Sequence, residues 1–211
     1  MTSLKNIEVE YRARFSKGKY EKLLKFLLKK AKDLGADDKR VWFFVLSDKF
    51  FKVTHNISAK SGKITLKLTK IGKGTDFKEI EFPIGEESVE PAVEFFTKLD
   101  YEYLLEPIIL RHNFLYKGVE LALKYSKTWG YHLELEIEIS SLAQKSKAEE
   151  KILKVADELE VKVMSEEELW EFTQKVEKTY KNKDIPLKEI KSDIEEAVTA
   201  VRSMRTGKIR L

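Results

Sequence analysis

Nine residues near the start of the chain, 7–15, alternate strictly between apolar and charged side chains. The charged members are two glutamates followed by two arginines: Glu8, Glu10, Arg12 and Arg14. Because a strand has a side-chain period of two, they share one face, with successive charged groups about 6–7 Å apart. Two carboxylates beside two guanidiniums have the chemistry to hold a metal ion next to an anion. An ordinary half-exposed strand with ion pairs on its outer face produces the same pattern.

Other segments of the chain carry charged faces of the same kind. Residues 63–70 alternate lysine and threonine with isoleucine and leucine, 108–114 include Arg111, and 133–139 alternate glutamate with leucine and isoleucine. If an eight-stranded sheet closes with these faces inward, its interior is wide enough for one small ligand. Buried charges are costly unless compensated, and a polyphosphate with Mg²⁺ or Mn²⁺ would compensate both signs. A sheet with its charged face in solvent is the alternative that the alternation leaves open.

The segments that carry these faces are short, and turn signals separate most of them. The pattern predicts about eight strands with two inserted helices, one running to Leu34 and one over 86–105. A new strand is expected over 108–114, and helices follow from residue 143. Ser165 with Glu168 forms a capping box for one of these later helices. Such an order favours an antiparallel barrel or sandwich over a parallel sheet.

Composition limits the classes of function. The chain has 211 residues, 42% of them hydrophobic and 36% charged, which is enough for a sizeable core under an ionic surface. It has no cysteine, so thiolate metal sites and thiol nucleophiles are excluded. A net charge of +4 gives no general affinity for nucleic acid. No apolar run approaches the roughly 20 residues that span a bilayer, so we expect a cytoplasmic protein without membrane contact.

The order of these segments resembles the CYTH superfamily, the triphosphate tunnel metalloenzymes. Glu8-x-Glu10-x-Arg12 is similar to the ExExK signature of that family. The segment around Lys67 resembles the family's strand with a phosphate-contacting lysine. Residues 118–136 resemble its paired closing strands, which end in a metal-side ExE.

The resemblance implies an α+β fold: an eight-stranded antiparallel β-barrel that forms a triphosphate tunnel, with peripheral and C-terminal helices. It covers about residues 4–180. We therefore expect a tunnel domain with following helices over 1–180, and a C-terminal helical extension with a basic tail over 181–211. The apolar faces of the last helices leave open whether they pack on the barrel or on a second subunit, in a homodimer.

The resemblance also implies roles for individual residues. Four carboxylates would lie on the metal side and hold Mg²⁺ or Mn²⁺: Glu8, Glu10, Glu134 and Glu136. Basic side chains would bind the triphosphate: Arg12, Arg14, Lys52, Lys67 and Arg111. Glu8, Glu10 and Arg12 would be the catalytic residues. Divalent ions would neutralise phosphate charge and orient a water for in-line attack.

The expected function is metal-dependent hydrolysis of inorganic triphosphate or of a nucleoside or other organic triphosphate. Three departures from the family pattern leave alternatives open. Arg12 stands where lysine is usual, Lys52-Val53-Thr54 where two arginines are common, and Lys124 where an aspartate is common. The alternatives are a class IV adenylyl cyclase, a tunnel that binds triphosphate or polyphosphate without turnover, and a purely structural barrel.

Overall fold

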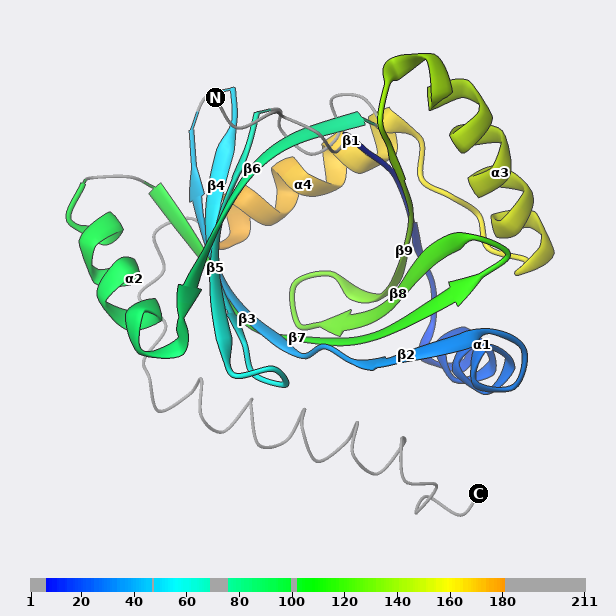
Figure 1. The fold of residues 1–211 in the computed structure, drawn as a ribbon, viewed down its shortest axis with the longest axis horizontal. Coiled ribbons are helices and arrows are strands. Elements are labelled where there is room, and N and C mark those ends of the chain that lie inside the picture. The colour runs from blue at the N-terminus through cyan, green and yellow to red at the C-terminus, as the bar shows by residue number, and fades with distance from the viewer. Residues whose placement is uncertain (1–6, 47, 69–75, 100–101, 181–211) are drawn as a thin grey trace.

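The computed structural model describes residues 7–46, 48–68, 76–99 and 102–180. Within these residues the strands are β1 (Ile7–Arg14), β2 (Lys32–Ala36), β3 (Lys39–Val45), β4 (Phe50–Asn56), β5 (Ser61–Lys67), β6 (Asp76–Gly85), β7 (Glu102–Tyr116), β8 (Val119–Ser126) and β9 (Gly130–Ile139). The helices are α1 (Lys17–Lys30), α2 (Val89–Thr97), α3 (Lys145–Glu158) and α4 (Glu166–Tyr180) (Figure 1). Short 3₁₀ turns, Glu86–Ser88 and Leu142–Gln144, precede α2 and α3.

Eight of the strands pair side by side in a closed antiparallel order (Figure 1). The order is β7-β3-β4-β5-β6-β1-β9-β8, and pairing between β8 and β7 completes the ring. Closure depends on the length of β7, whose first half pairs with β3 and whose second half pairs with β8. The short β2 pairs with the second half of β7, along the same edge of β7 that pairs with β3 in its first half. The predicted α+β fold with an eight-stranded antiparallel barrel is confirmed, and β2 is a ninth strand beside it.

The apolar face of β1 packs outside the ring, under α1 and α3. Val9 and Ala13 are fully buried there, together with Leu27 of α1 and Ile152 of α3. Helix α1 begins after Ser16, whose hydroxyl accepts a hydrogen bond from the Lys19 amide at 3.3 Å. Burial of this face fixes which face of β1 points into the ring, because side chains alternate along a strand.

The predicted end of the first helix at Leu34 is wrong. Helix α1 ends at Lys30, and the following residues form β2, with Gly35 at φ +89°. That φ lies in the left-handed region, which glycine adopts without steric cost. Apolar residues at helical spacing continue past Lys30, but backbone pairing with β7 takes the chain into a strand.

A second apolar cluster lies on the opposite side, where α2 covers the outer face of β3 and β4. Phe44 and Phe51 stack with ring centres 4.7 Å apart, and Phe96 of α2 closes on both rings. The predicted helix over 86–105 is too long, because α2 ends at Thr97. The predicted strand 108–114 is accordingly the second part of a longer one, since β7 begins at Glu102 and pairs with β3.

Helix α4 lies at the end of the ring where the turn between β8 and β9 is found. The predicted capping box is present: the Glu168 amide donates to the Ser165 hydroxyl, and the Ser165 amide donates to the Glu168 carboxylate. The Phe172 ring of α4 packs at 4.8 Å against Trp129 of the β8–β9 turn. Among the described residues, no helix has the length and apolar character needed to cross a bilayer. The predicted extension, 181–211, lies outside the described residues.

Candidate active site in the tunnel

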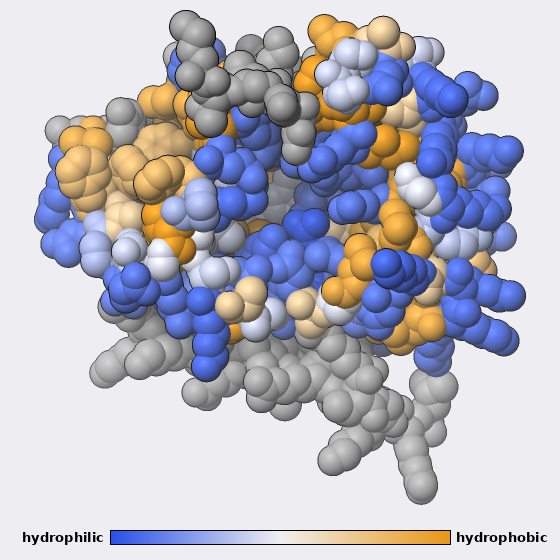
Figure 2. Space-filling view, in the orientation of Figure 1, coloured by the Kyte–Doolittle hydropathy of each residue, from blue (hydrophilic) through white to orange (hydrophobic). Residues whose placement is uncertain are grey.

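The ring encloses a cavity of 240 Å³ whose wall is formed mainly by charged side chains. Figure 2 shows this face of the molecule hollowed at its centre, with hydrophilic residues around the opening. The acidic residues of the wall are Glu8, Glu10, Glu79, Glu81, Glu134 and Glu136. The basic residues are Arg12, Lys39, Lys52, Lys63, Lys67, Arg111 and Lys124. The charged face of β1 therefore points inward, and the solvent-facing alternative is wrong.

Pairing between β1 and β9 sets the order of charges along one wall. The register places Glu8 opposite Glu138, Glu10 opposite Glu136, and Arg12 opposite Glu134. Two of these pairs bring carboxylates together, which is destabilising unless a cation compensates them. The third pair matches opposite charges. Along these strands, Glu136 and Glu138 have no ion pair with a described residue, whereas Glu134 is paired with both Arg12 and Lys124.

Three glutamates of β1 and β9 lie close together, and we call them the acidic cluster: Glu8, Glu136 and Glu138. Each offers a carboxylate oxygen, and these oxygens lie within 4.8 Å of one another. Burial raises the pKa of Glu8 to about 8, against the opposing effect of Lys67 at 3.6 Å. Burial and the nearby Glu10 raise the pKa of Glu136 to about 7. Oxygen donors this close together fit a hard divalent cation such as Mg²⁺ or Mn²⁺.

Glu134 forms ion pairs with two cations, and we call these three residues the Glu134 ion-pair group: Arg12, Glu134 and Lys124. Arg12 Nε donates to Glu134 Oε1 at 3.2 Å, and Lys124 Nζ donates to Glu134 Oε2. Burial opposes ionisation of Glu134, but Lys124 and Arg12 keep its pKa well below the usual range. Burial lowers the pKa of Lys124 to about 7, although the pair with Glu134 counteracts the lowering. Both carboxylate oxygens of Glu134, a predicted metal ligand, are therefore engaged with fixed cations.

The middle of the tunnel contains two lysines with different surroundings. Lys67 is ion-paired with Glu79 and lies 3.9 Å from Glu10, so nearby carboxylates raise its pKa despite burial. Lys52 has no ion pair with any residue that the structure describes. Burial and the neighbouring Lys67 lower the pKa of Lys52 to about 8. Because its ammonium is buried without a carboxylate partner among the described residues, Lys52 would strongly stabilise an anion that enters the cavity.

Arg111 lies where the wall meets the loop between β2 and β3. Its Nε donates to Asn113 Oδ1 at 2.6 Å and lies 3.5 Å from Asp37 Oδ2. Asp37 also pairs with Lys39 at 2.8 Å, which brings a second cation to the same part of the cavity. The side chain of Arg111 is thus oriented from behind, while it still lines the lumen.

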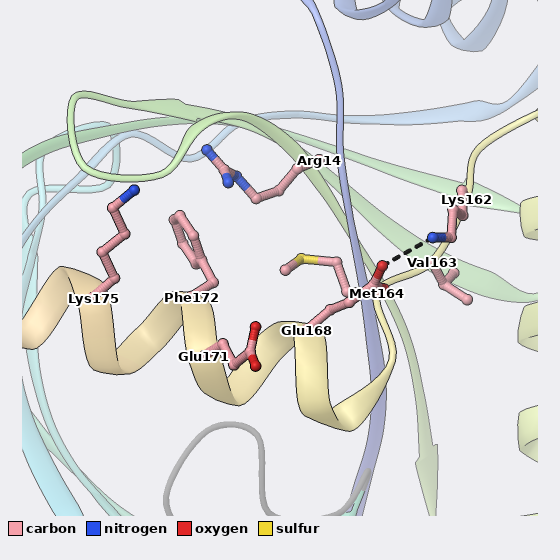
Figure 3. A pocket seen from close by; sticks show the side chains of 8 residues that line it. All are labelled: Arg14, Lys162, Val163, Met164, Glu168, Glu171, Phe172 and Lys175. Atoms are coloured by element: carbon pink, nitrogen blue, oxygen red, sulfur yellow. Dashed lines mark hydrogen bonds and ion pairs between the residues drawn. The ribbon is translucent and has the colours of Figure 1, made fainter.

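Arg14 is the one predicted site residue that the structure does not bring into this cavity. Its Nε donates to the Trp129 carbonyl at 2.9 Å, and its guanidinium lies 3.9 Å from the centre of the Phe172 ring. Figure 3 shows it turned toward α4 in a separate, open pocket of 430 Å³. Arg14 is the last residue of β1, so its side chain has left the enclosed part of the ring.

Several residues of the wall were not among the predicted site residues. They are Lys39, Lys63, Glu79, Glu81 and Lys124, with Glu138 in the acidic cluster. Glu79 and Glu81 alternate with Ile80 and Phe82 along β6, so the period that identified β1 was available for them too. The role of Glu138 depends on which residue of β1 lies opposite, and local sequence does not contain that information.

A closed antiparallel tunnel with an ionic lumen defines the class of the fold. Within that class, a family model for the CYTH domain matches residues 6–168. The chain belongs to the CYTH family, as its resemblance to triphosphate tunnel metalloenzymes predicted. A search of curated proteins finds no match.

Solved structures with the same fold come from several organisms. A conserved hypothetical protein from Pyrococcus furiosus is 25% identical, with a TM-score of 0.58, over 77% of this chain and 94% of that one. A candidate adenylate cyclase from Vibrio parahaemolyticus is 15% identical, with a TM-score of 0.58, over 89% and 99%. HpAC1 from Hippeastrum, a candidate adenylyl cyclase with a dominant triphosphatase activity, is 14% identical, with a TM-score of 0.53, over 75% and 89%.

Proposed function

We propose that the chain hydrolyses a triphosphate, inorganic or organic, inside the tunnel with the help of a divalent cation. The observation that carries this proposal is that an acidic cluster adjoins a wall of cations in one cavity, and that one of these cations, Lys52, has no ion pair among the described residues. A triphosphate with a divalent cation complements both regions, whereas a neutral ligand complements neither. Membership of the CYTH family supports the proposal, and so does the dominant triphosphatase activity of HpAC1, which has the same fold.

Glu8, Glu136 and Glu138 are the residues that would hold the cation; Glu10 lies opposite Glu136 but is ion-paired with Arg12 at 2.5 Å. Mg²⁺ and Mn²⁺ both match these oxygen donors. A bound divalent ion supplies charge neutralisation on phosphate oxygens and a lowered pKa for water. Glu134 belongs less directly to this set, because Arg12 and Lys124 engage both of its oxygens.

The basic side chains position the phosphates. We assign Lys52, Lys67 and Arg111 to contacts with phosphate oxygens, and Arg12 to a contact that its ion pairs with Glu10 and Glu134 orient. Phosphoryl transfer places negative charge on the oxygens of the transferred group. Fixed cations in a closed, poorly solvated cavity stabilise that charge without reorganising during the reaction. Arg14 faces Phe172 and is assigned no phosphate contact.

The test is to incubate the purified protein with inorganic triphosphate or ATP, with Mg²⁺ or Mn²⁺, and to measure release of phosphate and cyclic nucleotide. We expect metal-dependent phosphate release that is lost in Glu10→Gln, whose carboxylate is almost entirely buried in the tunnel wall. The matched control is Glu21→Gln, which removes an exposed carboxylate of α1 that pairs with Lys17. Full activity in a folded Glu10→Gln protein would overturn the assignment.

A tunnel that binds the same ligands without turnover is the second candidate. It is favoured by one observation, the neutralisation of Glu134 by two fixed cations, which leaves fewer carboxylates for catalytic metal ions. Thermal stabilisation by inorganic triphosphate without phosphate release identifies this case. Cyclic AMP as the product from ATP identifies a cyclase instead.

A further inference from the structure

Lys124 is a cation fixed inside the tunnel wall. Its side chain extends from β8 and lines the cavity, and only 7% of the residue is exposed. Its Nζ donates to Glu134 Oε2, while Arg12 Nε donates to the other oxygen of the same carboxylate. Glu134 therefore has a guanidinium on one oxygen and an ammonium on the other, so its charge is compensated by the chain itself.

The acidic cluster, whose Glu136 and Glu138 follow Glu134 along β9, has no such arrangement. Glu136 and Glu138 form no ion pair with any described residue, and Glu8 has Lys67 at 3.6 Å. The chain compensates the charge of Glu134 with two cations but that of the acidic cluster only with Lys67, so an external divalent cation fits the acidic cluster better than it fits Glu134. A second divalent cation at Glu134 would meet the Lys124 ammonium at close range in a poorly solvated cavity, where repulsion is strong.

We propose that Lys124 takes the place of a second divalent cation, so that the tunnel holds one ion, at the acidic cluster. This inference rests on the proposed function for its substrate: a phosphate group would lie between the ion at Glu8, Glu136 and Glu138 and the ammonium of Lys124. An entering phosphate anion favours the charged form of the lysine. Two-ion sites use the second ion as a charge clamp on the reacting phosphate, and a lysine supplies such a charge as a single fixed point.

The experiment is to count bound Mn²⁺ on the full-length protein by electron paramagnetic resonance of the free ion, with Mn²⁺ as the only added ligand. The wild-type chain should bind one tight Mn²⁺. Lys124→Glu should bind two, because it replaces the fixed cation with a carboxylate beside Glu134. Lys124→Gln, which removes the charge without adding a strong ligand, should still bind one and should raise KM for inorganic triphosphate by about tenfold or more.

A matched control is available on the surface. Lys117 pairs with Glu158 just as Lys124 pairs with Glu134, but the Lys117 side chain is exposed and outside the tunnel. Lys117→Glu should therefore bind one Mn²⁺ and keep wild-type turnover. If Lys124→Glu does not fold, shown by loss of its far-ultraviolet circular dichroism, the wild-type count and the Lys124→Gln protein still decide the question.

Two tight Mn²⁺ ions on the wild-type chain, or a single ion on folded Lys124→Glu, would overturn the role of Lys124. An unchanged KM in Lys124→Gln would do the same. Failure of this inference and failure of the proposed function give different results. A chain that binds one Mn²⁺, gains a second in Lys124→Glu and releases no phosphate keeps this inference and loses the hydrolase. A chain that releases phosphate but binds two tight Mn²⁺ ions keeps the hydrolase and loses this inference.

Discussion

The acidic cluster and the Glu134 ion-pair group lie side by side along β1 and β9, with Lys124 of β8 completing the second, yet their electrostatics are opposite. At one level Glu8, Glu136 and Glu138 face one another, and burial raises the pKa of Glu8. At the other, Arg12 and Lys124 keep the pKa of Glu134 well below its usual range, although burial opposes this. Register along β1 and β9 makes the difference, because it decides whether a glutamate meets a carboxylate or a guanidinium.

The largest expected effect is loss of turnover on removing one carboxylate of the acidic cluster. Glu136→Gln should lower metal-dependent phosphate release by at least about 100-fold, because even groups that only support a metal ligand matter by up to that factor. Stability without metal should be unchanged or slightly higher, since the substitution relieves repulsion from Glu10. Phosphate release and urea unfolding without metal check both parts. Parallel loss of stability and activity would show that Glu136 is structural.

The neighbouring residue on the same strand should show the reverse. Leu135 is fully buried on the outer face of β9, in the core under α1 and α3. Leu135→Ala should reduce the free energy of unfolding by about 2–5 kcal/mol, as expected for a large-to-small change in a core. Activity of the remaining folded protein should stay close to wild type at low temperature. Urea unfolding and initial rates measure the two effects, and a rate collapse in a still folded variant would contradict the separation of faces.

A smaller, pH-dependent effect is expected at Asp37. Burial opposes its ionisation, but Lys39 and Arg111 lower its pKa. Its ion pairs therefore contribute stability above the ordinary aspartate pKa, and this contribution is lost as the pH falls through the lower folded value. Asp37→Asn should cost about 1 kcal/mol at pH 7. The difference in urea midpoint from wild type should shrink toward pH 3. A constant difference across that range would show that the charge of Asp37 is not involved.

The smallest effect is expected at Arg14. Because its guanidinium packs on Phe172 outside the tunnel cavity, Arg14→Gln should change kcat/KM for inorganic triphosphate by less than about threefold. Loss of the contact with the ring should cost about 0.5–1 kcal/mol of stability. Steady-state kinetics and thermal melts provide the measurements. A rise in KM by tenfold or more would return Arg14 to the phosphate-binding residues.

The sequence predicted most of the barrel, because alternation over residues 7–15 and 133–139 is strong and the two segments do form β1 and β9. It failed for β2, an exposed five-residue strand without a buried face, whose pairing with β7 is long-range. It also extended α2 too far, since short apolar runs after Thr97 are compatible with either a helix or a strand.

The same limit applies to the site. The alternation of β1 predicted one charged face and left open whether that face points inward; the structure shows that Glu8, Glu10 and Arg12 line the cavity. Choosing between Glu134 and Glu138 as a neighbour of Glu8 required the pairing of β1 with β9, strands far apart in the sequence, which no local pattern encodes. Lys124 departs from the family pattern in the sequence, but its contact with Glu134 depends on the pairing of β8 with β9, which the sequence does not reveal.

The eight consecutive residue pairs between β1 and β9 have a consequence for how the chain tolerates changes in length. Deleting one residue from the middle of β1 would exchange faces for the rest of the strand, sending arginine into the apolar core and alanine into the lumen. Substitutions at single lumen positions leave that geometry intact. We therefore expect insertions and deletions to be confined to the connections between strands, while strand lengths within the ring stay constant.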